Sequence, residues 1–281
     1  MIASNPVSLS TMLVLGRTDP ATAAPSTAAI DRLAVWAQEN GFEAVELSDR
    51  WLPPLQTEVW LNAAQRLAEA GLETRSVSTF RRLPVGPQAG PDDAAELRFS
   101  VELANALGAV ACLAIAAPKG AWRPLARADR LALTEFVADL AERAADGGGR
   151  IAVELHDDGP FDSAAAIWEL LDQLQDPAVG VNPDLANRLR QDPAWDWRTD
   201  LERLAPRMAL WHVKNVHQGG PVDLDQGQID YGLACAIVQQ AGFSGPVVPE
   251  TRFGDSPLDA AVRAAAVLRR HWRAQTLIGE S

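Results

Sequence analysis

Hydrophobic positions along the chain fall into short apolar runs, and each run is followed by a longer segment whose apolar residues recur with helical spacing. A run of the first kind predicts a buried strand, and the segment after it predicts an amphipathic helix. The pattern repeats eight times. The expected strands cover residues 7–13, 44–48, 73–78, 109–115, 150–156, 179–184, 209–215 and 245–250.

The boundaries between these segments support the same division. Gly41, Gly71 and Gly108 each follow the last apolar-periodic residue of a segment, where glycine commonly ends a helix. Because no long linker rich in Pro, Gly or Ser interrupts the alternation, we expect one domain, residues 1–281, with the α/β fold of a single (β/α)8 TIM barrel. An open doubly wound sheet is the alternative, but it normally carries a glycine-rich loop after its first strand, and this sequence has none there.

Four expected strands end in polar residues where buried parallel strands are normally apolar. Glu154, Asp184, His212 and Glu250 lie at these ends, separated by 30, 28 and 38 residues, and each interval matches one strand–helix repeat. The active sites of such barrels lie at the carboxyl ends of the strands. We therefore expect the four side chains to converge at one mouth of the barrel.

Three carboxylates that converge in a buried pocket repel one another unless a proton or a cation relieves the repulsion. An imidazole beside them favours the cation. The set offers mostly oxygen ligands and one nitrogen, which suits Mn²⁺, with Mg²⁺, Co²⁺, Fe²⁺ and Zn²⁺ as alternatives. For any one of these residues alone, a helix cap, a surface ion pair or a buried core histidine is the competing interpretation.

The composition narrows the class of protein. A net charge of −12 disfavours nucleic acid as a partner, because phosphate backbones are bound by Lys and Arg. Cys112 and Cys235 sit in apolar runs and are expected to be buried, reduced thiols. The N-terminal segment does not resemble a signal peptide, and no apolar run reaches about 18 residues, so we expect a soluble cytoplasmic protein without membrane partners.

With these motifs in order, the chain resembles the xylose isomerase-like TIM-barrel superfamily, in particular its sugar phosphate isomerase/epimerase group. The likeness covers nearly the whole chain. It is carried by the segments GFEAVELS, ELANALGAVACLAI, IAVELH, VGVNPDLAN, LWHVKN and DQGQIDYGLACAIVQQAGFSGPVVPE. Each segment is a weak pattern alone, whereas their order and spacing are specific for the superfamily.

The resemblance implies a role for each matching residue. Glu154, Asp184, His212 and Glu250 match the metal ligands of the family, and Glu154 and Glu250 also match its acid–base pair. Two positions depart from the family pattern. Asn187 stands where a histidine often follows the strand-six aspartate, and Asn215 stands where an aspartate often follows the strand-seven lysine.

The activity that the resemblance implies is isomerisation or epimerisation of a ketose or keto-polyol through an enediolate. A divalent metal ion stabilises such an enediolate while one glutamate removes the α-proton and the other returns it. A metal-dependent lyase or dehydratase that acts on an inosose, a dehydroshikimate-like acid or a 3-keto-glycoside is an alternative. A non-catalytic ligand-binding barrel is another. An endonuclease IV-like enzyme is disfavoured, because it needs more histidines from the early strands, and none precedes His156.

The small-molecule substrate is expected to contact further side chains near the same strand ends. These candidates are Glu46, Trp122, His156, Asn187, Lys214 and Arg252. Several have a competing structural interpretation: Lys214 and Arg252 as ion pairs with neighbouring carboxylates, Glu46 as the partner of a nearby base, and Trp122 as ordinary loop packing. Homo-oligomers are common among members of the group, so the resemblance leaves self-association open.

Overall fold

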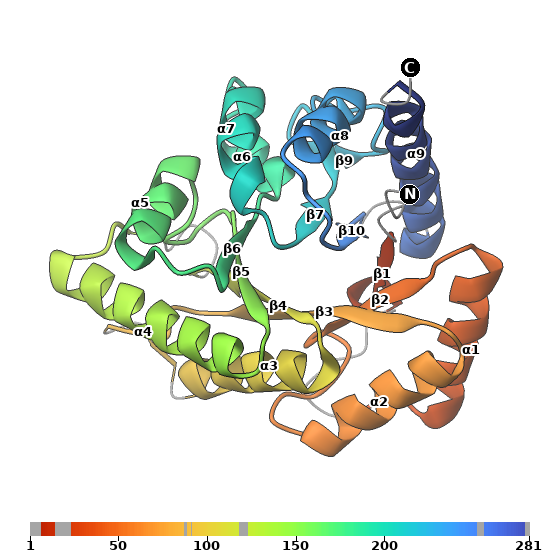
Figure 1. Ribbon diagram of the computed structural model, residues 1–281, viewed down its shortest axis with the longest axis horizontal. Coiled ribbons are helices and arrows are strands. Elements are labelled where there is room, and N and C mark those ends of the chain that lie inside the picture. Colours follow the sequence, from red (N-terminus) through yellow and green to blue (C-terminus); the bar gives the residue numbers. More distant parts are fainter. Residues whose placement is uncertain are drawn as a thin grey trace.

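The computed structural model of the chain describes residues 7–14, 24–86, 89–90, 92–117, 123–251 and 256–278. Eight strands of this part form a ring, and the helices lie around its outside (Figure 1). The ring strands are β1 (Ser8–Ser10), β2 (Ala44–Ser48), β3 (Glu73–Arg81), β4 (Val110–Ile115), β5 (Arg150–Glu154), β6 (Val179–Asn182), β7 (Trp211–Val213) and β10 (Val247–Pro249).

Parallel pairing runs around this ring. Strands β1 to β6 form one sheet in chain order, and β7 pairs with β10. Two parallel bridges join these parts, Val7 to Val247 and Val181 to Met208. Because the bridges connect both edges of the six-stranded sheet to the β7–β10 pair, the prediction of an α/β barrel is confirmed.

The helices follow the strands as the sequence pattern predicts. They are α1 (Thr27–Glu39), α2 (Thr57–Glu69), α3 (Asp93–Leu107), α4 (Arg127–Asp146), α5 (Ala164–Leu174), α6 (Leu185–Gln191), α7 (Trp197–Leu204), α8 (Tyr231–Gln240) and α9 (Pro257–Ile278). Short 3-10 turns, η1 (Thr11–Val14) and η2 (Ala205–Arg207), complete the helical elements of the described residues.

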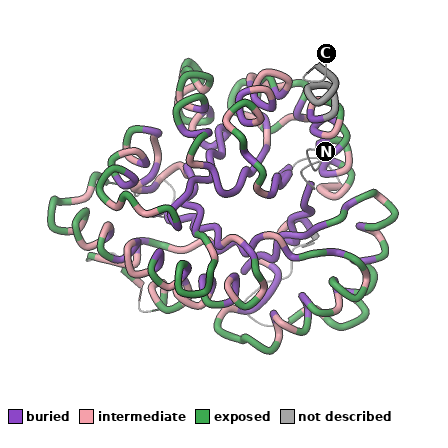
Figure 2. The backbone as a smooth tube through the Cα atoms, in the orientation of Figure 1, coloured by how far each residue is buried: buried purple, intermediate pink, exposed green. Residues whose placement is uncertain are grey.

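Local chemistry sets several helix boundaries. At the start of α1, the Ser26 hydroxyl accepts a hydrogen bond from the Ala29 amide, as a capping serine commonly does at the first turn of a helix. At the end of α3, Gly108 adopts a left-handed conformation with φ 64°, which an L side chain disfavours. The apolar face of each helix packs on the strands, and buried residues follow the ring and the inner sides of the helices (Figure 2).

Three differences from the sequence pattern bear on the site. The expected strand 209–215 divides at Lys214 into β7 and a second strand, β8 (Asn215–His217), which pairs antiparallel with β9 (Gly220–Val222). The expected strand 150–156 ends at Glu154, so His156 follows the strand instead of belonging to it. The short helix α6 was not predicted, because seven residues give too little periodicity to recognise.

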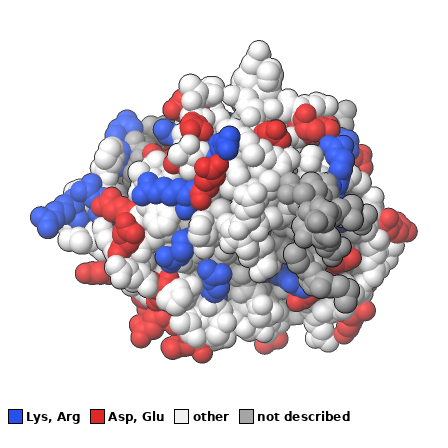
Figure 3. All heavy atoms as spheres, turned by 45° about the horizontal axis from the view of Figure 1, so that its top comes forward, with Lys and Arg blue, Asp and Glu red and all other residues white. Residues whose placement is uncertain are grey.

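The distribution of charged side chains on the outer surface bears on which macromolecules the protein could bind. On the face shown in Figure 3, acidic and basic side chains are interspersed, without one continuous basic area among the coloured atoms. Both cysteines are buried free thiols, as expected. Among the described residues, no helix combines the length and apolarity needed to cross a membrane.

Candidate metal centre and active site

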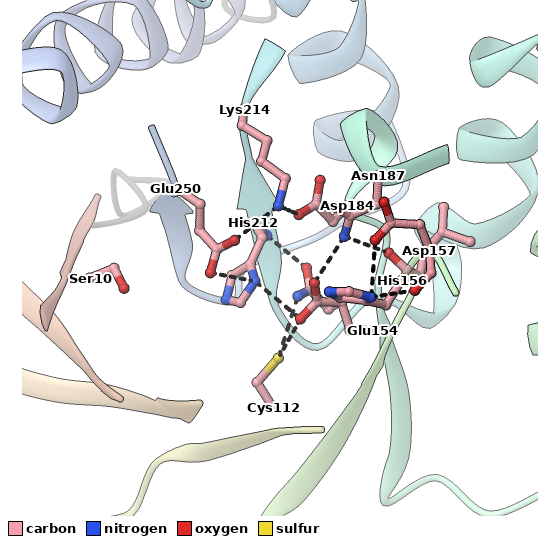
Figure 4. A network of polar contacts seen from close by, with 12 residues as sticks. Ser10, Cys112, Glu154, His156, Asp157, Asp184, Asn187, His212, Lys214 and Glu250 are labelled. Atoms are coloured by element: carbon pink, nitrogen blue, oxygen red, sulfur yellow. Dashed lines mark hydrogen bonds and ion pairs between the residues drawn. The ribbon is translucent and has the colours of Figure 1, made fainter. Parts of the chain in front are cut away.

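The four polar strand ends meet inside the barrel. Glu154 is the last residue of β5, Asp184 lies just before α6, His212 is the middle residue of β7, and Glu250 follows β10. Each contributes one oxygen or nitrogen atom, and these four atoms all lie within 4.8 Å of one another. The residues are between 0 and 8% exposed, and Figure 4 shows their side chains pointing toward one another.

His212 is oriented by a carboxylate on its far side. Its Nε2 lies 2.9 Å from Oε2 of Glu46, which also accepts hydrogen bonds from the hydroxyls of Ser10 and Ser76. Glu46 is therefore the acceptor that keeps a proton on Nε2. The other ring nitrogen, Nδ1, lies 3.3 Å from Glu250 and forms no hydrogen bond of normal geometry with the described residues. When the ring is neutral, a lone pair on Nδ1 is thus available to a cation.

This arrangement decides between the two interpretations of Glu46. The residue is fully buried behind His212 and does not line the cavity of the site. A direct contact between Glu46 and a substrate hydroxyl does not fit this position, because the histidine ring stands between them. In the structure Glu46 instead pairs with a nearby base, His212, as the second interpretation expects.

Glu154 is held by Asn187. The Nδ2 group of Asn187 donates to Oε1 of Glu154 at 3.1 Å and to the carbonyl of Leu155 at 3.1 Å. Its Oδ1 accepts from Arg190 at 2.8 Å, so all parts of this buried amide have partners. From the other side, the thiol of Cys112 donates to Oε2 of Glu154 at 3.6 Å. This thiol contact could not be predicted, since the residues of strand β4 show only an apolar pattern.

Lys214 connects two of the carboxylates. Its Nζ forms an ion pair with Asp184 and a hydrogen bond of 3.1 Å with Oε2 of Glu250. The expected ion pair of Lys214 with neighbouring carboxylates is therefore formed, and because Lys214 also lines the cavity, its contact with a substrate stays a prediction. Asp184 Oδ1 forms no hydrogen bond with the described residues, so this buried oxygen also has room for a cation.

The electrostatics of the cluster follow from burial and crowding. Burial raises the pKa of Asp184 to about 6, although the charge of Lys214 opposes this shift. Burial alone would lower the pKa of His212, but the charges of Glu250 and Glu46 outweigh it and raise that pKa well above its ordinary value. Burial alone would raise the pKa of Glu154, but the close contact with His212, whose Nδ1 lies 3.5 Å from Oε2 of Glu154, and the charge of His212 outweigh burial, so this pKa is lowered.

The residues fit a divalent cation. Glu46, Glu154, Asp184 and Glu250 bring four carboxylates into one buried region, and Lys214 is their only fixed cation among the described residues when His212 is neutral. A divalent ion would balance two of the remaining charges and accept the free electron pairs of His212 Nδ1 and Asp184 Oδ1. The donor set, mostly oxygen with one nitrogen, is typical of hard or borderline metals.

A cavity of about 430 Å³ opens beside this cluster, a volume that is typical of small-molecule sites. Its lining includes Glu154, Glu250, His156, Asn187 and Lys214. The Nδ1 atom of His156 contacts the carbonyl of Asp157 at 2.7 Å, and its ring packs 5.1 Å from the ring of Phe80. Trp122 and Arg252, which were expected to contact the substrate, lie outside the described residues.

The cavity also has a wall that the sequence pattern did not indicate. Asp49 and Arg50, just after β2, and Phe80, near the end of β3, line it. The available signal was the polar pair that follows AVELS, at the strand level where active-site residues occur.

Comparisons with known proteins agree with the barrel. Residues 34–271 match the model of the xylose isomerase-like TIM barrel family. A xylose isomerase-like TIM barrel protein from Mycobacterium smegmatis, in complex with magnesium, is 21% identical with a TM-score of 0.81, and the match covers 96% of this chain and 97% of that one. A comparison with curated protein sequences finds no significant match.

Two further solved structures are similar over nearly the whole chain. L-ribulose 3-epimerase is 16% identical with a TM-score of 0.76, covering 97% of both chains. The probable 3-DHS dehydratase AsbF from Bacillus anthracis is 18% identical with a TM-score of 0.69, covering 94% of this chain and 98% of that one. At these identities the likeness shows a shared fold, whereas the activity has to be argued from the site.

Proposed function

Since this chain belongs to the xylose isomerase-like TIM barrel family, we propose that it is a divalent-metal-dependent sugar isomerase or epimerase. Its substrate is a ketose or keto-polyol that reacts through an enediolate. The observation that carries the proposal is the convergence of Glu154, Asp184, His212 and Glu250 beside a cavity of about 430 Å³, with Glu154 and Glu250 both lining that cavity.

In this proposal the same four residues hold the metal ion, and Mn²⁺ is the ion we assign. A set of three carboxylates and one imidazole suits Mn²⁺ or Mg²⁺. Structural zinc, in contrast, is usually held by several thiolates. The presence of magnesium in the similar protein from Mycobacterium smegmatis supports a divalent ion of this kind. When bound, the ion supplies Lewis acidity, which polarises a carbonyl oxygen and stabilises negative charge on the substrate.

Glu154 and Glu250 act as the acid–base pair. One carboxylate takes the α-proton of the substrate, and the other returns a proton to the same or the adjacent carbon. Asn187 fixes the orientation of Glu154 through its 3.1 Å hydrogen bond, and Lys214 does the same for Glu250. His156 lines the cavity, and in this proposal it hydrogen-bonds a substrate hydroxyl. Trp122 and Arg252 remain proposed substrate contacts.

The test is exchange of the substrate α-proton with solvent deuterium, followed by NMR for a panel of ketoses and keto-cyclitols. The Mn²⁺-loaded protein is expected to exchange this proton and to form an epimer or aldose–ketose isomer. Glu154→Gln and Glu250→Gln should each lower the rate by about 10²–10⁴, the usual contribution of general acid–base catalysis. Metal content is measured in each variant, because these residues also serve as ligands.

Glu58→Gln is the matched control for this experiment. Glu58 is exposed on α2 and is not among the residues that line the cavity, so its substitution should leave the exchange rate unchanged. If the metal-loaded protein exchanges no proton with any member of the panel, the proposal is wrong. If it exchanges the proton equally well after both glutamate substitutions, another residue removes the α-proton and the roles assigned to Glu154 and Glu250 are wrong.

A dehydratase on the same site is the second candidate, and the similarity to the probable 3-DHS dehydratase AsbF favours it. If the hydroxyl β to the carbonyl can leave as water after removal of the same α-proton, the product is an enol that tautomerises to a deoxy dicarbonyl compound instead of an epimer. The same NMR experiment distinguishes the two reactions. Loss of a hydroxyl-bearing carbon signal with a new deoxy methylene and a second carbonyl signal indicates dehydration, and deuterium incorporation into an intact polyol indicates isomerisation or epimerisation.

A further inference from the structure

Arg50 stands on a rigid turn beside the catalytic cavity. The turn follows β2, where the amide of Arg50 donates to the Ser48 hydroxyl at 3.2 Å and the amide of Trp51 donates to the Ser48 carbonyl at 2.9 Å. Trp51 and Leu52, the next two residues, are buried in the core. The backbone of Arg50 is therefore fixed, and its half-buried side chain lines the cavity that also contains Glu154 and Glu250.

The guanidinium of Arg50 is also held in place. It lies 4.8 Å from the centre of the Phe80 ring, a distance at which a cation is attracted to the face of an aromatic ring. Phe80 in turn packs against His156, another residue of the cavity wall. An arginine stacked on an aromatic ring leaves the edge of its planar group, with the N–H donors, available to a ligand.

Other basic side chains of the cavity already have partners. Lys214 is paired with Asp184 and Glu250, and Arg190 is paired with Asp157. Arg50, by contrast, forms no ion pair with a carboxylate of the described residues. This is unusual inside a pocket of a chain with a net charge of −12, where carboxylates outnumber bases.

The carboxylate nearest along the chain does not fill this role. Asp49 accepts a hydrogen bond from the Phe80 amide at 3.0 Å and forms an ion pair with Arg81, which is also paired with Glu96. Asp49 is thus hydrogen-bonded and paired elsewhere on the wall, and its charge acts on Arg50 without a direct ion pair. A half-buried cation that faces a cavity with no directly paired carboxylate among the described residues is stabilised when a ligand supplies the negative charge.

We propose that Arg50 binds an anionic substituent of the substrate, a carboxylate or a phosphate, within the catalytic cavity. The planar guanidinium matches the paired oxygens of either group, which is why arginine commonly recognises both. The inference rests on the proposed function, since it names the substrate class of the same site: an acidic or phosphorylated ketose rather than a neutral one.

The experiment compares ketohexoses that share the carbonyl end and differ only at C6. Each is tested as the neutral sugar, as the 6-phosphate and as the 6-carboxylate, with the Mn²⁺-loaded protein and calorimetric titration. We expect at least one anionic series to bind ten or more times more tightly than its neutral counterpart. The phosphate and carboxylate arms identify which of the two groups the cavity accepts.

Arg50→Gln tests the residue directly. It should weaken binding of the preferred anionic sugar about 10- to 100-fold more than that of the neutral sugar, as expected when a charged hydrogen-bond pair is lost. Arg50→Lys keeps the charge without the planar fork and should give a smaller loss. Arg32→Gln removes the same charge from the exposed surface of α1 and should change neither affinity. Thermal unfolding of each variant shows whether it is folded.

The outcomes separate this inference from the proposed function. If the neutral ketoses exchange their α-proton and the anionic series bind no better, or do not bind at all, the inference is wrong and the proposed function stands. If anionic sugars bind through Arg50 but no sugar exchanges a proton, the proposed function is wrong and the anion site stands. Equal losses for Arg50→Gln and Arg32→Gln would also overturn the inference.

Discussion

Glu46 and His212, 166 residues apart in the sequence, form a fully buried contact in which Oε2 of the carboxylate lies 2.9 Å from Nε2 of the imidazole. Neither side chain is exposed to solvent. A carboxylate behind a histidine fixes both the ring orientation and the position of its proton. In this chain the contact turns Nδ1 toward Glu154 and Glu250, so the geometry of the cluster depends on a residue that is not itself one of its four members.

Glu46→Gln is therefore expected to weaken binding of Mn²⁺ about 10- to 100-fold, the usual effect of losing the partner of a metal-binding histidine. The glutamine keeps the size of the side chain and can still contact Ser10 and Ser76, so the fold should be retained. Isothermal titration with Mn²⁺ measures the affinity. The control is Glu43→Gln, which changes the exposed residue just before β2. This variant should bind the metal like the unaltered protein. Equal affinities in both variants would contradict the role assigned to Glu46.

Metal binding is also expected to stabilise the fold. When Mn²⁺ is added to chelator-treated protein at about 100 times its Kd, the free energy of unfolding should rise by about 2.7 kcal/mol. Differential scanning calorimetry shows this as an increase in Tm. Asp184→Asn removes the charge of one proposed ligand in the cluster and should reduce the increase. A Tm that does not respond to Mn²⁺, Mg²⁺ or Co²⁺ would favour a barrel without a metal site.

The affinity for the metal is expected to rise with pH. Burial raises the pKa of Asp184 to about 6, while Glu250 and Glu46 overcome the opposing effect of burial on His212 and raise its pKa well above the ordinary value. As proposed ligands, both groups can bind a metal only when deprotonated, so protons should compete with the metal at low pH. Titrations in buffers of different ionisation enthalpy should show proton release falling from about two near pH 5 toward one near pH 7. An affinity that is constant over this range would contradict the prediction.

The barrel could be predicted from the sequence because its signal is repeated. Eight alternations of apolar run and helical segment, with glycines such as Gly108 at helix ends, leave few topologies open. Features without a repeat could not be predicted. The expected strand 209–215 is interrupted at Lys214, whose side chain pairs with two distant carboxylates, and the chain continues from there into the β8–β9 hairpin.

For the site, spacing predicted which strand ends meet but not what surrounds them. Glu154 and Glu250 are found side by side because parallel strands end at the same level. The assignment of Glu46 depended on which side of His212 it occupies, and a sequence does not show this. Arg50 was missed because its significance lies in having no directly paired carboxylate among the described residues, which only the arrangement of Asp49, Arg81 and Glu96 makes visible. The roles of the site residues stay predictions.

Asn215, which departs from the aspartate common in the family, has a structural reason for being an amide. Its Nδ2 donates to the carbonyls of Leu224 and Ile229 at 2.7 and 2.9 Å, and its Oδ1 accepts from the amides of Val216 and Ile229. Asn215→Asp would place a carboxylate oxygen against two buried carbonyls, so the free energy of unfolding should fall by roughly 1–3 kcal/mol. Urea unfolding followed by tryptophan fluorescence measures the loss. Asn62→Asp, on the exposed face of α2, should change stability by less than about 0.5 kcal/mol, and an equally small change for Asn215→Asp would show that this amide does not anchor the loop.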